Sequence, residues 1–150
     1  MIHGNISYVD KIGKLILRLR ISNAELEMYR SEELKKRTKQ FAIRIIKLFR
    51  ALPRTEEARV IGKQMLRSGT SVAANYRAVC RARSKAEFIA KMGVVVEESD
   101  ETVLWLELLV DTQIVSGRRM TELLAEANEL LAIFAASQHT ARMKRVVMNQ

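Results

Sequence analysis

Residues 84–109 read SKAEFIAKMGVVVEESDETVLWLELL, and this stretch decides the fold class. Its apolar and small residues recur at alternating steps of four and three, the spacing of a helix that buries one face in a bundle. The positions of this seam are Phe88, Met92, Val95, Ser99, Thr102, Leu106 and Leu109. Ser84 and Glu87 have the S-x-x-E spacing of a capping box. The stretch therefore predicts a long helix that starts after Ser84 and ends at Ser116-Gly117.

Three further helices flank this one. The first carries a seam at Leu34, Thr38, Phe41, Ile45, Leu48 and Leu52, starts at a Ser31 cap and ends before Pro53. The second is capped by Thr55 and carries Ile61, Met65, Ser68, Val72, Asn75 and Val79. The last places Met120, Leu123, Leu124, Ala127, Leu130, Leu131 and Phe134 inward. Short loops between long helices predict an all-α, antiparallel up-down-up-down four-helix bundle.

The pattern divides the chain into three parts. Residues 31–140 form the predicted bundle. Residues 1–30 are a poorly patterned N-terminal extension, interpreted either as a short helix or as a mis-assigned start that precedes a true start at Met28. Residues 141–150 form a basic tail.

The composition favours a cytoplasmic protein. Cys80 is the one cysteine, which excludes an internal disulfide framework and fits a reducing compartment. No apolar run approaches the roughly 20 residues that a membrane-spanning helix needs. We therefore expect no membrane partner.

Charge is distributed unevenly along the chain. The net charge is +9, but residues 1–96 hold 21 Lys and Arg against 8 Asp and Glu, whereas residues 97–150 hold 5 against 9. A basic half and an acidic half indicate either a face that binds a polyanion or complementary surfaces between subunits.

The basic residues give the candidate binding site. They lie away from the seams of the first two helices and in the loop that follows: Lys36, Lys39, Lys47, Arg50, Arg59, Lys63, Arg67, Arg77, Arg81 and Arg83. Two helices joined by a short loop are neighbours, so these cations are predicted to form one stripe that contacts nucleic-acid phosphates. The chain has only eight Phe, Trp and Tyr, which favours structured RNA or a duplex backbone over stacked single strands. Alternatively, the charge pairs with acidic helices of adjacent subunits.

Nothing in the sequence predicts catalysis, a metal or a cofactor. The histidines, His3 and His139, lie towards the ends of the chain, and no E-x-x-H pair of a di-iron bundle occurs. The acidic group Glu97, Glu98 and Glu101 is predicted to be solvated or salt-bridged, and the Cys80 thiol to be half-buried.

Two further features are interpreted as structural. The small residues from Ser68 to Asn75 allow a neighbouring backbone to approach, and Asn75 is expected to bond a neighbouring helix and fix its register. Trp105 is expected in the core or at a subunit interface.

Several runs resemble one known family. They are residues 64–75 (QMLRSGTSVAAN), 83–92 (RSKAEFIAKM), Glu98 with 101–106 (ETVLWL), and 41–48 (FAIRIIKL). The chain resembles, over residues 34–136, the bacterial four-helix bundle proteins encoded in intervening sequences of large-subunit ribosomal RNA genes. The signature positions are Arg67, Ser68, Ser71, Asn75, Ser84, Glu87 and Phe88.

The resemblance implies a bundle that assembles as a ring, typically a pentamer, and that is not an enzyme. The family is also similar to the accessory variability protein of diversity-generating retroelements, a basic pentameric ring that binds RNA and partners a reverse transcriptase. Many relatives carry acidic residues after the signature Asn, whereas this chain has Tyr76, Arg77 and Arg81, a change that favours anions. The predicted function is therefore a homo-oligomeric accessory bundle that binds RNA or DNA backbone. The alternative is a homo-oligomeric scaffold whose target is protein.

Overall fold

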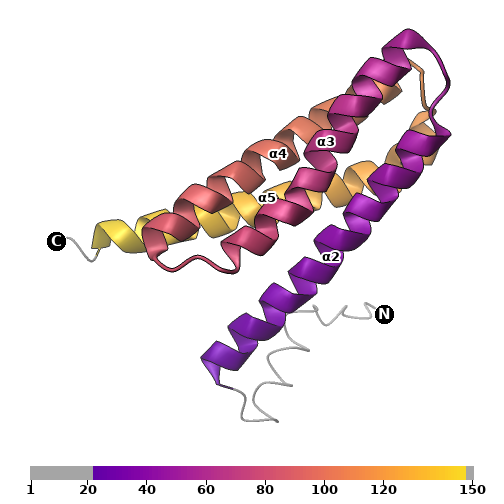
Figure 1. Cartoon of the computed structure of the whole chain (residues 1–150). Helices are drawn as coiled ribbons and strands as arrows, with labels where there is room; N and C mark the ends of the chain where they lie inside the picture. Colours follow the sequence, from indigo (N-terminus) through magenta and orange to yellow (C-terminus); the bar gives the residue numbers. More distant parts are fainter. Residues whose placement is uncertain (1–21, 148–150) are drawn as a thin grey trace, which may run out of the picture. The chain divides into compact units, whose positions relative to one another are not determined.

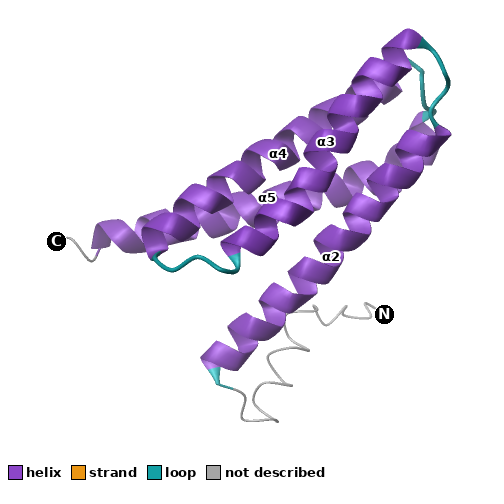
Figure 2. Ribbon diagram, in the orientation of Figure 1, coloured by secondary structure: helices purple, strands orange, loops and turns teal. Residues whose placement is uncertain are grey.

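The fold is known from a computed structural model that describes residues 22–147, with only the backbone for residues 144–147. Four helices follow one another: α2 Asn23–Ala51, α3 Glu56–Val79, α4 Lys85–Asp111 and α5 Gly117–Val147 (Figures 1 and 2). No strand occurs in this part of the chain. The predicted all-α four-helix bundle is confirmed.

The chain divides after Leu34 into two units. The described part of the first unit, residues 22–34, is the start of α2. The second unit, residues 35–150, holds the bundle, in which α4 packs against both α3 and α5.

Side-chain caps begin α3 and α4 as the sequence predicts. The Thr55 hydroxyl accepts a hydrogen bond from the N–H of Ala58. At α4, the Ser84 hydroxyl accepts from the N–H of Glu87 at 3.0 Å. The Glu87 carboxylate in turn accepts from the N–H of Arg83 at 2.7 Å, so the reciprocal bond of the box goes to the residue before the cap.

The predicted start of the first helix at Ser31 is wrong. The helix starts at Asn23, where Ser22 and Glu25 form their own capping box. Ser31 lies inside the helix and donates its hydroxyl to the carbonyl of Met28. A serine followed by acidic residues resembles a cap, but in mid-helix a hydroxyl can bond its own preceding turn instead.

The buried residues of α4 match the predicted seam. Met92, Val95, Ser99, Thr102, Leu106 and Leu109 are buried, and Phe88 is half-buried. In α3 the predicted Met65, Ser68, Val72 and Val79 are buried as well, and so are Ala58, Gly62, Gly69 and Tyr76, which the prediction did not include. Ile61 and Asn75, both expected inside, are half-buried.

Two glycines account for the added buried positions of α3, because side chains of α2 and of the turn after it pack directly on them. A Cβ on Gly62 would lie 2.6 Å from Leu52 Cδ1, and one on Gly69 would lie 2.9 Å from Ile45 Cγ1. A pattern of large apolar residues does not reveal a seam position that is occupied by glycine.

The core also contains a small polar layer. Thr38, Ser68, Ser99 and Thr102 are buried, and the hydroxyls of Ser68 and Thr102 share a hydrogen bond of 2.9 Å between α3 and α4. The other hydroxyls donate to backbone carbonyls one turn earlier in their own helix. The Ser99 hydroxyl, for example, donates to the Val95 carbonyl at 2.7 Å. The predicted interhelical bond of Asn75 is wrong, because its amide donates to Ser71 in its own helix.

Ion pairs connect α2 to α5. Arg37 donates to Glu126 through Nε at 2.7 Å and through Nη2 at 2.8 Å, and its Nη2 lies 2.8 Å from Glu129. Arg44 lies 3.9 Å from Glu122. Bonding to Arg37 holds the pKa of the Glu126 carboxyl below its usual value. Bidentate pairing of this kind fixes the angle between the two side chains as well as their distance.

Within residues 22–147, no helix is both long enough and apolar enough to cross a bilayer.

Candidate nucleic-acid interface

The outer faces of α2 and α3 carry the candidate cations. On α3, Arg59, Lys63 and Arg67 follow one another at steps of four, and Arg77 continues on the same face, whereas Arg81 lies in the turn after the helix ends at Val79. On α2, Lys36 and Lys39 share a face with Lys47 and Arg50, which lie eleven residues (about three turns) further on. These nine residues are called the basic stripe below, and all are exposed, as is Arg83 in the next loop.

The contact between α2 and α3 aligns the two rows. Because Phe49 and Leu52 pack at Gly62, Arg50 and Lys63 lie at the same level. The contacts at Gly62 and Gly69 thus bring the two rows together next to the turn that joins the helices.

Arg59 and Arg67 of the stripe are engaged within the protein, and Lys36 also makes an interaction there. Arg59 Nε bonds Glu56 at 3.1 Å in the first turn of α3. Arg67 reaches α4, where it pairs with Glu98 at 3.3 Å and with Glu101. Arg67 therefore holds α3 to α4, and the predicted salt-bridged state of Glu98 and Glu101 is confirmed.

Most of the other cations of the stripe are available to bind an anionic ligand. Among the described residues, no ion pair forms on Lys39, Lys47, Arg50, Lys63, Arg77 or Arg81, nor on the side chain of Arg83. Residues 35–83 hold fourteen Lys and Arg against two Asp and Glu, whereas residues 84–134 hold four against ten. The bundle thus has an electropositive pair of helices, α2 and α3, followed by an acidic stretch that contains α4.

The remaining signature residues have structural roles. Ser68 bonds Thr102 in the core, Ser71 offers its carbonyl to Asn75, and Ser84 and Glu87 cap α4. Lys91 bonds Glu87 at 2.8 Å and, with the N–H of Arg83, holds the pKa of that carboxyl below its usual value. None of these side chains forms a polar pocket on the basic stripe.

Outside the basic stripe, the described residues that could act as metal ligands, nucleophiles or bases do not cluster into a site. Within the described residues no cluster of His, Cys, Asp and Glu has the arrangement of a metal site. Cys80 is a free, half-buried thiol, as expected. His139 is exposed on α5, whereas His3 lies outside the described residues.

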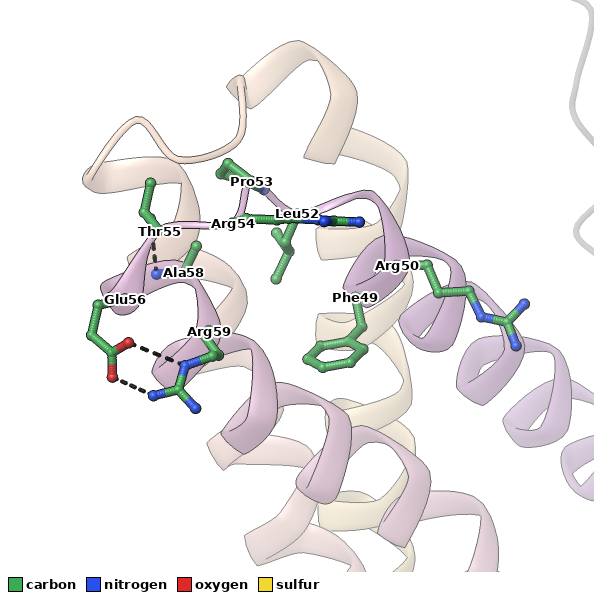
Figure 3. Close-up of a pocket in the computed structure, with 9 residues that line it drawn as sticks. All are labelled: Phe49, Arg50, Leu52, Pro53, Arg54, Thr55, Glu56, Ala58 and Arg59. Atoms are coloured by element: carbon green, nitrogen blue, oxygen red, sulfur yellow. Dashed lines mark hydrogen bonds and ion pairs between the residues drawn. The ribbon is translucent and has the colours of Figure 1, made fainter.

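One hollow lies beside the stripe, at the turn between α2 and α3 (Figure 3). It has a volume of about 440 Å³ and is lined by Phe49, Arg50, Leu52, Pro53, Arg54, Thr55, Glu56, Ala58 and Arg59. Arg54 was missed as a candidate because it belongs to neither helix pattern. Its position directly after Pro53, between two basic helices, was the available signal.

Trp105 is half-buried on α4, and its buried indole N–H has no hydrogen-bond partner in the described part of the chain. On the same helix Val94 and Leu104 are exposed by 42% and 47%. The outer side of α4 therefore combines apolar surface with the exposed carboxylates of Glu97 and Asp100.

Comparisons with known proteins show to which family this bundle belongs. No curated protein matches the chain. A solved structure from Bacteroides thetaiotaomicron, a protein of unknown function from the S23 ribosomal protein family, is 32% identical with a TM-score of 0.67. That match covers 73% of this chain and 97% of the other. The family model of the 23S rRNA-intervening sequence protein matches residues 30–136. The chain therefore belongs to the 23S rRNA-intervening sequence protein family.

Proposed function

We propose that this protein is a non-enzymatic, cytoplasmic, self-assembling bundle that binds the phosphate backbone of nucleic acid through the basic stripe. One observation carries the proposal: on α2, on α3 and in the turn after α3, six exposed cations form no ion pair within the described residues. Exposed, unneutralised Lys and Arg in a row gain free energy from phosphates by releasing condensed counterions.

The length of the stripe fits a backbone ligand. From Lys63 to Arg77 is fourteen residues, or about 21 Å at 1.5 Å per residue. That span corresponds to about six base pairs at 3.4 Å of rise per phosphate on one strand. Between these two ends Arg67 is held by Glu98 and Glu101, and Thr70 donates its hydroxyl to carbonyls of its own helix, so the stripe favours a backbone ligand without base readout.

Self-assembly is part of the proposal, with the pentameric ring of the resemblance as its expected form. Its support is the apolar surface that the closed bundle leaves on α4, at Val94 and Leu104. Because Glu97 and Asp100 flank this surface, two copies of it would repel one another. A heterologous contact, which generates rings, is therefore favoured over an isologous one.

Two measurements test this function together. The mass of protein purified at low salt is measured by light scattering, and its absorbance ratio is measured before and after nuclease. We expect a ring mass with nuclease-sensitive nucleic acid. The logarithm of the affinity for a short RNA duplex should then fall linearly with the logarithm of the salt concentration, with a slope of at most about −5 per subunit for the six unpaired cations.

A matched pair of variants locates the binding surface. Lys47→Gln on the stripe should lower duplex affinity at every sequence and reduce the salt slope by about one. Arg118→Gln removes the same charge at an exposed position of α5 and should leave the duplex affinity and the salt slope unchanged. Equal losses of duplex affinity in the two variants would mean that binding depends on the overall charge of the protein and not on the basic stripe.

The acidic outer side of α4 favours a second candidate, a homo-oligomeric scaffold for protein. In that case the stripe of one subunit meets the carboxylates of α4 in the next, and no phosphate is bound. A clean ring without nucleic acid at low salt, which dissociates as salt rises, would support the scaffold over the nucleic-acid binder.

A further inference from the structure

The hollow at the turn between α2 and α3 combines an apolar floor with a cationic rim. Phe49 and Leu52 form the floor beside the fully buried Ala58. Arg54 lies across the floor, and Arg50 and Arg59 line its edge, with the Arg50 side chain pointing away from the hollow. Figure 3 shows the Arg54 side chain extending across Leu52 towards the side from which Arg50 projects, while Arg59 turns to Glu56. With one carboxylate among these four charges, the rim carries a net charge of +2.

Several contacts hold the hollow in shape. Leu52 and Phe49 rest on Gly62, where even a Cβ would come within 2.6 Å and 3.1 Å of them. Pro53 has a fixed backbone φ, and Thr55 caps α3 through the N–H of Ala58. The floor is therefore preformed, so a ligand need not pay to order it.

This chemistry suits a planar apolar group that carries anionic neighbours. Phe49 and Pro53 offer carbon surface for a ring, and an arginine guanidinium can stack on one face of it. Among the described residues, Arg50 and Arg54 form no ion pair and are available for phosphates. The volume of about 440 Å³ lies within the range of small-ligand sites.

We propose that the hollow takes one unpaired nucleotide of a bound strand, with its base on the apolar floor and the flanking phosphates on Arg50 and Arg54. The inference rests on the proposed function, because Arg50 and Arg59 belong to the basic stripe and join the two surfaces. The stripe then binds a duplex segment, and the hollow selects strands in which an unpaired base adjoins that segment. Unpaired bases are the usual point at which proteins discriminate among structured RNAs.

Two RNA hairpins with one stem sequence test this, the second carrying a single 2-aminopurine bulge. Affinity is measured by anisotropy, and stacking by the fluorescence of the bulged base. We expect the bulged hairpin to bind about tenfold more tightly, with the fluorescence quenched on binding. Arg54→Gln should abolish both the preference and the quenching.

The control is Lys47→Gln, which removes the same charge from the stripe outside the hollow. It should weaken both hairpins by the same factor and leave the preference and the quenching intact. Equal affinity of the wild-type protein for the two hairpins would overturn the assignment of the hollow and leave the proposed function standing. Binding of neither hairpin would overturn both.

Discussion

At the scale of single residues, Gly69 determines how closely α2 can approach α3. A Cβ there would lie 2.9 Å and 3.0 Å from the two γ-carbons of Ile45, which is fully buried. Ile45 is β-branched on a helix and has one strongly preferred rotamer, so it cannot turn aside. A side chain at residue 69 would therefore force Ile45, and α2 with it, to shift.

Gly69→Ala should accordingly destabilise the protein, although alanine is the better helix former. Overpacking costs about 1–3 kcal/mol, against about 1 kcal/mol gained in helix propensity, so we expect a net loss of up to about 2 kcal/mol in the free energy of unfolding by urea. Gly93→Ala is the control, because its Cβ would meet only the Nε2 end of the flexible Gln138 side chain, which donates to the Ile89 carbonyl. Loss of that hydrogen bond and the gain in helix propensity each amount to about 1 kcal/mol, so stability there should be almost unchanged. A Gly69→Ala protein as stable as the control would contradict the close packing.

At the scale of elements, α2 is held on its two sides by different forces. Apolar packing at Gly62 and Gly69 holds it to α3, whereas the pairs of Arg37 and Arg44 connect it to α5. The Arg37–Glu126 pair is half-buried and bidentate, and the Arg44–Glu122 pair is exposed and 3.9 Å apart. The first pair should therefore contribute far more to stability than the second.

The pH dependence of Glu126→Gln tests this difference. Hydrogen bonding to Arg37 lowers the pKa of Glu126 in the folded state, so the pair stabilises fully above the unfolded pKa of about 4.3. That stability is lost as the pH falls through the lower, folded-state pKa. We expect a loss of about 1 kcal/mol in the variant at pH 7 that disappears under acid conditions. Glu122→Gln, the same change on the same helix, should cost almost nothing at either pH, and a pH-independent loss in Glu126→Gln would refute the ionic explanation.

The elements also show how far the sequence could predict the fold. Large apolar residues with 4-3 spacing mark the buried face of α4 directly, because leucine, valine and methionine cover that seam. On α3 the same rule fails at Gly62 and Gly69, because close packing there selects the absence of a side chain. The stripe was predictable because charges on surface positions follow helical spacing, whereas the engagement of Arg67 depends on the register between α3 and α4. The hollow depends on the shape of the turn between α2 and α3, which periodicity does not describe.

At the scale of the whole molecule, positive charge gathers on α2 and α3, whereas α4 combines exposed carboxylates with exposed apolar side chains. The basic stripe covers α2 and α3, and α4 presents Val94 and Leu104 between carboxylates. A subunit with such an arrangement can bind a polyanion with one face and another copy of itself with the other. The two tasks are compatible only if assembly leaves the stripe uncovered.

Leu104→Glu tests whether the outer side of α4 is the assembly surface. Leu104 is 47% exposed in the subunit, so the charge costs little in a monomer, but it would be buried unpaired in an interface. We therefore expect the light-scattering mass to fall to that of a monomer while the helical circular dichroism is retained. Met143→Glu, at a residue of α5 that is 55% exposed, should keep the mass of the wild type. If Leu104→Glu assembles like the wild type, α4 is not the assembly surface. If the monomer it forms still binds duplex RNA with lower avidity, the stripe and the assembly surface are separate, as the proposed nucleic-acid function requires and the scaffold does not.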